Sequence, residues 1–199
     1  CLLDMLRLPP LLILLTSLVQ AADLKLSTVF SDHAVLQAGE ANVYGKAKPG
    51  ASVQVVYGSA QATATAGADG LFKATLTGLR ATEEGKDLVI KSGAESHVAK
   101  DVIVGEVWVG SGQSNMEWVV RNTSDAAAAR ARPVDNGIRV FTVARTPKAT
   151  PAEDVQGSWK VAGPTTVDGF TAAGYYFAVA VRAELKQPVG IIHTSIGGT

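Results

Sequence analysis

A serine in a glycine-rich loop is the clearest candidate for chemistry in this sequence. Ser114 lies in the run Gly110-Ser111-Gly112-Gln113-Ser114-Asn115-Met116, directly after a short apolar strand predicted at 106–109. A serine where a strand gives way to a helix lies beside free backbone amides, which can stabilise an oxyanion. A serine hydroxyl alone is a poor nucleophile and needs a base, normally a histidine held by a carboxylate. The run therefore indicates serine hydrolase chemistry.

The same run fits other glycine-rich motifs poorly. It begins like a dinucleotide-binding fingerprint, but Asn115 stands where a third glycine is needed, and the predicted strand at 137–143 ends without a ribose-binding acid. The run contains no Gly-Lys-Ser/Thr sequence for phosphate binding. It also differs from the nucleophile elbow, because Met116 rather than glycine comes two residues after Ser114. These differences argue against nucleotide binding.

Strands and helices alternate in the second half of the sequence. We predict strands at 106–109, 137–143 and 189–193, and a helix at 171–187 that Thr171 caps and Pro188 ends. This alternation favours parallel pairing, which would bring the Ser114 loop and the second glycine-rich loop, 194–199, to the edge of the sheet where ligands bind. One side of the helix is expected to pack through Tyr176, Phe177, Val179, Ala180 and Leu185.

Short alternating strands fill the first half of the sequence. They are predicted at 42–45, 52–57, 62–65, 71–76 and 88–90. Turn sequences rich in proline and glycine separate several of these strands: Lys48-Pro49-Gly50, Ala68-Asp69-Gly70 and Ser92-Gly93. Residues 23–104 therefore predict a small antiparallel β-sandwich, which we interpret as a supporting module because it has no acidic cluster and no metal-ligand spacing.

Composition excludes several classes of function. The chain has 199 residues, of which 47% are hydrophobic and 18% charged, so it should fold. Eighteen basic residues balance eighteen acidic ones, which gives no electrostatic basis for binding nucleic acid or an anionic membrane. Cys1 is the single cysteine, so neither an internal disulfide nor a cysteine-rich metal site is expected. We expect no cofactor and no metal.

The first 22 residues resemble a cleavable signal peptide. Arg7 precedes an apolar run at 11–19, which ends in small residues at Ala21 and Ala22. The run is too short to favour a transmembrane anchor, and a buried N-terminal helix is the alternative. We expect a secreted or periplasmic protein without a membrane anchor.

Four segments together resemble the sialate O-acetylesterase family, part of the SGNH (GDSL-like) hydrolase superfamily. Segment 105–117 carries Gly112-Gln113-Ser114-Asn115-Met116 at its centre, and segments 30–37, 170–177 and 189–199 agree with it. The resemblance implies an α/β fold class. In it, a β-sandwich-like N-terminal region leads into the first part of a three-layer α/β/α hydrolase domain with a parallel sheet, here residues 105–199.

The resemblance also implies an activity and a site. The activity is hydrolysis of acetyl esters on O-acetylated carbohydrates, such as sialic acids or plant polysaccharides. Ser114 would be the nucleophile. Its amide, together with a glycine of the Gly197-Gly198 loop, would form the oxyanion hole, with Gln113 as a further contributor.

The sequence departs from the family in its catalytic base. In this family the general-base histidine and its aspartate lie near the C-terminus of a longer chain, whereas this sequence stops at Thr199. None of His33, His97 and His193 lies in an Asp-x-x-His arrangement. We expect His33 and His97 to be structural or exposed and His193 to support its loop. The resemblance therefore indicates a C-terminally truncated esterase with an incomplete hydrolase domain and little activity alone.

A non-catalytic carbohydrate-binding or accessory module, built on the β-sandwich, is the alternative function. Trp108 and Trp118 could line a pocket for an acyl group or a sugar, but a tryptophan at such positions favours the core. Glu117 and Asp125 are interpreted as solvated helix positions without a role.

Overall fold

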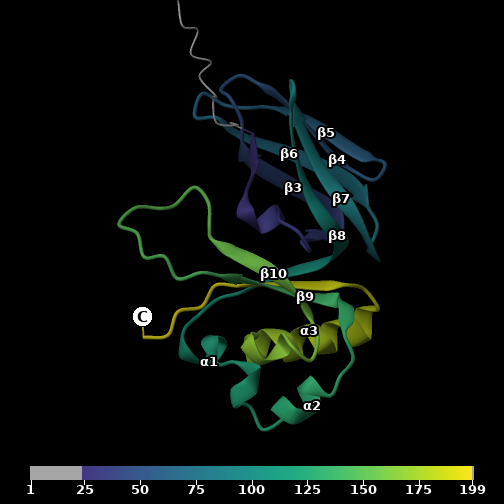
Figure 1. Ribbon diagram of the computed structural model, residues 1–199, viewed down its shortest axis with the longest axis vertical. Helices are drawn as coiled ribbons and strands as arrows, with labels where there is room; N and C mark the ends of the chain where they lie inside the picture. Colours follow the sequence, from purple (N-terminus) through teal and green to yellow (C-terminus); the bar gives the residue numbers. More distant parts are fainter. Residues whose placement is uncertain (1–23, 199) are drawn as a thin grey trace, which may run out of the picture.

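The protein is described by a computed structural model that covers residues 24–198. The predicted signal peptide, Cys1 included, and Thr199 lie outside the described residues. Figure 1 shows two parts along the chain, an N-terminal assembly of strands above and a sheet with helices below. The chain is therefore mixed α/β, with more strand than helix, as the sequence predicts.

The N-terminal part consists of strands in two sheets. A three-stranded sheet has the order β1-β3-β6, and β7 and β4 lead outward from β8 to β5 in the larger sheet. The predicted turns are confirmed, since Gly50, Gly70 and Gly93 all have positive φ angles. The elements of this part are β1 Lys25–Leu26, η1 Thr28–Phe30, β2 Val35–Gln37, β3 Gly39–Lys46, β4 Ser52–Tyr57, β5 Ala60–Thr65, β6 Leu71–Leu79, β7 Thr82–Ser92 and β8 Glu95–Gly110.

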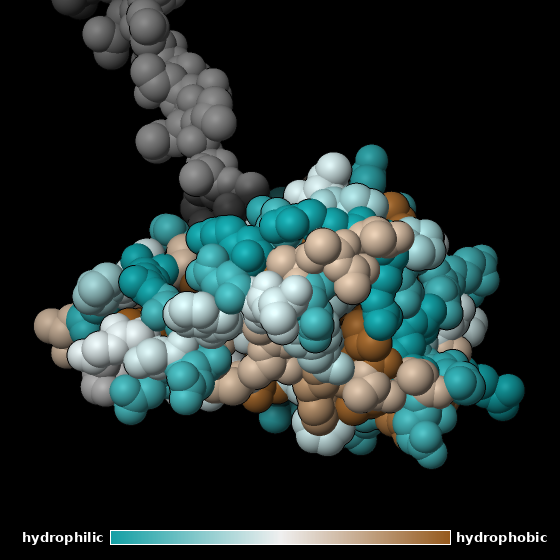
Figure 2. Space-filling view, turned by 90° about the horizontal axis from the view of Figure 1, so that it is seen from below, coloured by the Kyte–Doolittle hydropathy of each residue, from teal (hydrophilic) through white to brown (hydrophobic). Residues whose placement is uncertain are grey.

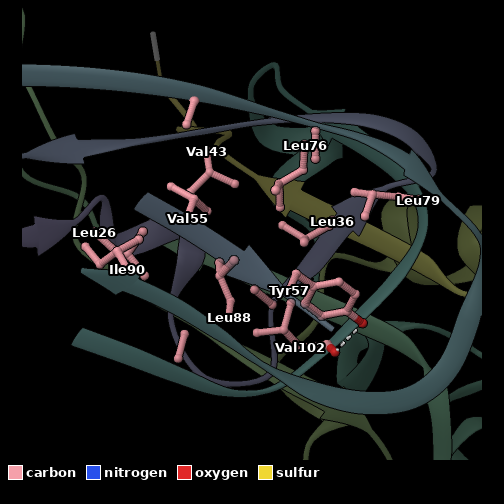
Figure 3. Close-up of a cluster of buried hydrophobic side chains, with 14 of the residues drawn as sticks. Leu26, Leu36, Val43, Val55, Tyr57, Leu76, Leu79, Leu88, Ile90 and Val102 are labelled. Atoms are coloured by element: carbon pink, nitrogen blue, oxygen red, sulfur yellow. Dashed lines mark hydrogen bonds between the residues drawn. The ribbon is translucent and has the colours of Figure 1, made fainter. Parts of the chain in front are cut away.

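The first hydrophobic core lies between these two sheets. Alternate residues of each strand point into it, so that Val55 of β4, Leu76 of β6 and Leu88 of β7 lie in one cluster (Figure 3). Tyr57 also lies in this core, where its hydroxyl donates a hydrogen bond to the carbonyl of Val102 at 2.9 Å. Burial raises the pKa of Tyr57 to about 12, so the side chain remains a neutral donor.

Strand β8 connects the two parts of the molecule. Its first portion pairs antiparallel with β7, and its last five residues pair in parallel with β11 (Val189–His193). The expected division between residues 104 and 105 falls inside this strand. Gly105 lies at the crossover, where a β-carbon would overlap the backbone carbonyl of Pro188. Glycine is therefore required for this close approach of two backbones.

The second part contains the predicted parallel strands. Strand β9 spans Asp135–Val143, and the order β9-β11-β8 is parallel throughout. The three strands include all the residues that were predicted as strand in this part of the sequence. Strand β10 (Gly157–Ala162) adds an antiparallel edge beside β9 that the sequence reading did not predict. Trp159 of β10 donates a hydrogen bond to the carbonyl of Val29 at 2.7 Å, which joins this sheet to the N-terminal part.

The helices cover one face of this sheet, below it in Figure 1. They are α1 Ser114–Glu117, η2 Val120–Asn122, α2 Ala126–Arg130, η3 Val167–Gly169 and α3 Ala172–Leu185. The opposite face is covered by the N-terminal part, whose core includes Phe141 and Trp159. Residues 24–198 thus show one helical layer of the expected three-layer arrangement.

Helix α3 matches its prediction in extent but not in its buried face. Thr171 caps it by accepting a hydrogen bond from the amide of Gly174 at 3.4 Å, and left-handed Lys186 ends it before Pro188. The expected packing face was wrong in part. Tyr175 and Ala178 are buried against the sheet, whereas Phe177, Ala180 and Leu185 are exposed. The small residues Ala172, Gly174 and Ala178 bring the helix close to the sheet, which periodicity of large side chains does not reveal.

A buried arginine also joins the two parts. Arg139 of β9 is fully buried; its Nη1 donates to the carbonyl of Asp101 at 2.5 Å, and its Nη2 lies 3.1 Å from Asp101 Oδ2. His33 Nδ1 lies 2.7 Å from the same carboxylate. Although partial burial raises the pKa of Asp101, hydrogen bonds and charge from His33 and Arg139 outweigh it and lower the pKa overall.

Candidate active site

The two glycine-rich loops lie side by side at the carboxyl edge of the parallel sheet. The last residues of β8 and β11, Gly110 and His193, are direct partners in the register. Backbone hydrogen bonds continue this pairing into the loops, from Thr194 N to Gly110 O at 2.9 Å and from Ile196 N to Gly112 O at 3.0 Å. The convergence expected from the strand order therefore occurs, and it brings Ser114, Gln113, Gly197 and Gly198 to one edge.

Ser114 begins the short helix α1 and is exposed to solvent. Gln113 precedes it, and the carbonyl of Gln113 accepts hydrogen bonds from the amides of Met116 and Glu117 at 2.9 and 3.0 Å. These bonds close a single helical turn immediately after the strand. A hydroxyl on such a turn can be approached by a substrate from solvent.

The start of α3 supports this turn from below. Thr171 Oγ1 donates to the carbonyl of Met116 at 2.6 Å, and the amide of Ala172 donates to the carbonyl of Trp118 at 2.7 Å. The side chain of Met116 lies under the loop, where its Cγ would be 3.1 Å from a β-carbon at Gly112. The position of Ser114 is therefore determined by packing on α3 as well as by the strand.

Glu117 connects the two loops, although the sequence predicted a solvated position without a role. Its Oε2 accepts a hydrogen bond from the amide of Gly197 at 2.8 Å, and its Oε1 forms an ion pair with Arg145 of the β9–β10 connection. A residue three positions after Ser114 lies on the same side of a helical turn, which is the signal that could have drawn attention to it. Its partners lie 28 and 80 residues away, and spacing does not predict such contacts.

The two loop glycines differ in their surroundings. A β-carbon at Gly197 would lie 3.7 Å from Ser114 Cα, so this glycine closely approaches the serine. Its amide hydrogen is used by Glu117. Gly198 has a φ angle of +86°, a left-handed conformation that favours glycine.

His193 supports the second loop. It is 7% exposed, as is Ser195, and its Nε2 lies 2.5 Å from Ser195 Oγ. Burial lowers the pKa of His193, and the charge of Arg145 lowers it further, against an opposing contribution from the nearby backbone of Met116. Nδ1 has no hydrogen-bond partner of good geometry among the described residues. The imidazole is therefore neutral at pH 7.

The other two histidines lie away from the loops. His33 pairs with Asp101, and His97 is exposed on β8. Within residues 24–198, none of the three histidines forms a hydrogen bond with Ser114. The described part of the chain thus presents an exposed serine beside two glycine-rich loops, and none of its described histidines is hydrogen-bonded to that serine.

Two tryptophans near the site are more exposed than the sequence predicted. Trp108 and Trp118 were expected in the core, but both are about half exposed. Trp108 packs edge to face on Phe177 of α3, and Trp118 donates from its indole to the carbonyl of Asn122. Figure 2 views the helical face and shows apolar surface reaching solvent among polar residues.

A search of residues 24–198 finds no group of three or more histidine, cysteine or acidic side chains that could hold a metal ion. In the same residues, no helix is both long and apolar enough to cross a membrane.

Comparisons with known proteins agree with the sequence motifs. The sialate O-acetylesterases of Rattus norvegicus and Mus musculus are each 32% identical to this chain over 114 residues. A solved carbohydrate acetylesterase from Xanthomonas citri is 34% identical and superposes on 88% of this chain with a TM-score of 0.82. No model of a known protein family matches the sequence.

The chain spans only part of these relatives. It covers 20% of the two mammalian proteins and 40% of the bacterial esterase chain. The matches nevertheless come from both a sequence comparison and a structure comparison. They confirm the similarity to a sialate O-acetylesterase-like family and the α/β fold.

Proposed function

We propose, from the similarity of this chain to sialate O-acetylesterases and to a bacterial carbohydrate acetylesterase, that it belongs to an enzyme that removes acetyl groups from O-acetylated carbohydrates. The proposal rests mainly on one structural observation. An exposed serine and a second glycine-rich loop meet at the carboxyl edge of a parallel sheet, where α/β proteins bind their ligands.

Ser114 is the proposed nucleophile. Its Oγ would attack the acetyl carbonyl carbon and form a tetrahedral intermediate. The bond from that carbon to the sugar oxygen would then break, and the sugar would leave as an alcohol after taking up a proton. Water would hydrolyse the acetyl-serine to acetate and restore the hydroxyl. These steps need a base for the serine proton, which is later returned to the leaving group.

The amides of Ser114 and Gly198 are the proposed oxyanion donors. The family resemblance allows either Gly197 or Gly198 to contribute an oxyanion donor, but the amide of Gly197 already donates a hydrogen bond to Glu117 Oε2. Gly197 is then a spacer that allows close approach to Ser114, which leaves the amide of Gly198 as the proposed donor from this loop. The side chain of Gln113, which precedes the serine, could add a third donor.

The base is proposed to come from outside residues 24–198. His193 is neutral and thus able to accept a proton, but its Nε2 is engaged with buried Ser195. The chain covers 40% of the solved esterase, which supports the proposal that it is the N-terminal part of a longer enzyme. Sequencing downstream of codon 199 tests this directly, since an open frame with an Asp-x-x-His block would support it and a stop codon would contradict it.

Hydrolysis assays test the nucleophile. The protein produced from its complete gene is assayed with p-nitrophenyl acetate and with O-acetylated sialic acid and xylan. Ser114→Ala is expected to lower kcat by about a thousandfold or more, since the nucleophile and base act as a unit. Ser111→Ala, an exposed serine of the same loop, is the matched control and should retain activity. Turnover at the wild-type level in Ser114→Ala would falsify the proposed mechanism.

Export remains part of the proposal. The signal-like segment 1–22 supports a secreted or periplasmic enzyme. The mass of the protein recovered from the medium or periplasm tests it, with cleavage expected after Ala21 or Ala22. An uncleaved protein retained in the cytoplasm would contradict export.

A further inference from the structure

A cavity lies away from the candidate active site, on the N-terminal part. It has a volume of about 540 Å³ and lies between the outer face of the β1-β3-β6 sheet and the long connection from β9 to β10, residues 144–156. Figure 1 shows this connection, in green, beside the purple N-terminal segment. None of its lining residues belongs to the loops around Ser114 or Gly197. The groove is thus separate from the proposed catalytic serine.

Asp154 attaches the outer wall of this groove to the segment that follows β1. Its carboxylate accepts hydrogen bonds from Ser27 Oγ at 2.7 Å, from the amide of Thr28 at 3.0 Å and from Thr28 Oγ1 at 2.8 Å. Although burial raises the pKa of Asp154, these hydrogen bonds outweigh it and lower the pKa overall. The carboxylate is therefore ionised at neutral pH and holds the wall in place.

The groove has an excess of positive charge. Four lysines line it, and two of them pair with the connection, Lys25 with Asp154 at 3.4 Å and Lys46 with Glu153. Lys73 and Lys148 form no ion pair or hydrogen bond within residues 24–198. In a chain of zero net charge, two uncompensated ammonium groups in one groove are a local attraction for an anion.

The floor of the groove is apolar and aromatic. Tyr44 and Leu71 point outward from the sheet and are 42% and 40% exposed. The ring of Tyr44 is held by an edge-to-face contact with Phe30 at 4.9 Å between centroids. Tyr44 and Lys73 are direct partners in the β3–β6 register, so the ring and the charge lie on the same face. An apolar surface with a few charged groups is typical of a ligand site.

We propose that this groove binds a carboxylate-bearing sugar, that is, an acidic carbohydrate with uronic acid or sialic acid residues. The carboxylate would be attracted by Lys73 and Lys148, and the apolar face of a sugar ring would lie on Tyr44 and Leu71. Two uncompensated charges and an aromatic floor match a sparsely charged ring better than a densely charged phosphate chain. The groove would retain the enzyme on a charged glycan, independently of catalysis at Ser114.

Titration of the purified protein produced from its complete gene tests this binding, with trigalacturonic acid and 3′-sialyllactose as the two acidic probes. The methyl ester of trigalacturonic acid and lactose are their neutral counterparts. We expect saturable binding of at least one acidic probe that weakens with added salt, and much weaker binding of its neutral counterpart. Failure of both acidic probes to bind, or equal binding of the neutral ones, would overturn the proposal. Equal competition by inorganic phosphate would also overturn it, because the site would then recognise any anion.

Matched variants locate the binding in the groove. The double variant Lys73→Ala and Lys148→Ala is expected to weaken binding at least about fivefold, because each exposed ion pair contributes modestly. Lys91→Ala with Lys160→Ala, two exposed lysines outside the groove, is the control. Tyr44→Ala should also weaken binding, with the urea midpoint confirming that it folds. Ser114→Ala should bind like the wild type, so failure of the esterase proposal does not affect this test. Equal affinity of the groove and control double variants would contradict the proposal.

Discussion

The two parts of the molecule differ in how completely they cover their apolar residues. Among the described residues up to Val104, three large hydrophobic side chains are exposed, each by about 40%, whereas eight are exposed between residues 105 and 198. Val109 reaches 68% and Trp108 45%. An apolar surface that reaches solvent beside a candidate site is a surface on which a ligand, a partner or a further segment can pack.

The two portions of strand β8 differ in how completely their edges are paired with other strands. In the N-terminal part β8 has neighbours on both sides, β7 and, at residues 103–105, β2. From Glu106 to Gly110 it pairs only with β11 among the described residues, so its other edge carries no strand. This edge lies next to the Ser114 loop. If the enzyme continues beyond Thr199 as proposed, this edge and Trp108 are where additional chain would complete the site.

The largest effect is expected at the arginine that joins the two parts. Asp101→Ala removes the carboxylate that pairs with buried Arg139, and because that carboxylate is itself 43% exposed, the expected cost is about 2 to 3 kcal/mol. Urea unfolding monitored by tryptophan fluorescence measures this loss, with all three tryptophans in the second part. Asp125→Ala, at an exposed carboxylate, is the control and should change stability by less than about 0.5 kcal/mol. Equal stability of the two variants would show that the junction does not depend on this pair.

A glycine at the crossover should show the next largest effect. Gly105→Ala introduces a methyl group into the space of the Pro188 carbonyl, so β8 and β11 must separate, at about 1 to 3 kcal/mol. Gly169→Ala is the matched control, because no heavy atom outside its immediate neighbours lies within 4 Å of its β-carbon position. Chemical denaturation compares the two. If Gly105→Ala is as stable as the control, the close contact in β8 does not restrict this position.

Local patterns were sufficient to predict much of the fold. Alternation predicted five strands of the N-terminal part, apolar runs predicted the three parallel strands, and Thr171 and Pro188 predicted the extent of α3, whereas β1, β2 and β10 were not predicted. The position of the two loops at one edge followed from parallel strands, which end together. These features depend on neighbours in sequence or on a general rule of topology.

Contacts across long separations were not predictable in the same way. Glu117 was interpreted as solvated because nothing nearby in the sequence identifies Gly197 or Arg145 as its partner. The exposure of Trp108 and Trp118 was missed because a tryptophan in a strand has the same local pattern whether or not another strand covers it. The requirement for glycine at position 105 comes from the close approach of the Pro188 backbone, which no periodicity encodes.

Glu117 should affect local rather than global stability. Glu117→Ala removes the acceptor of the Gly197 amide, and a hydrogen bond to a charged group contributes about 1.5 kcal/mol, or roughly tenfold in exchange protection. Glu117→Gln keeps an acceptor and loses only the charge that pairs with Arg145, so its effect should be smaller. Hydrogen exchange by NMR resolves this at Gly197, with amides of β4 in the N-terminal core as internal control. Unchanged exchange at Gly197 in Glu117→Ala would exclude a role in holding the loop.

The smallest effect is a pH-dependent one at Asp154, where the β9–β10 connection is attached to the N-terminal part. Its pKa is lower in the folded protein than the unfolded value of about 3.9, so its contribution to stability is complete above that value and disappears as the pH falls through the folded pKa. Asp154→Asn is therefore expected to be less stable than the wild type by about 1 kcal/mol at pH 7, with the difference narrowing below pH 4. Urea midpoints at pH 7, 5, 3 and 2 measure this convergence, and Asp87→Asn, an exposed carboxylate, is the control. If the wild type and Asp154→Asn differ in stability by the same amount at pH 7 and pH 2, the ionised carboxylate does not hold the two parts together. The wall of the groove beside Asp154 would then be held by contacts that do not depend on this charge.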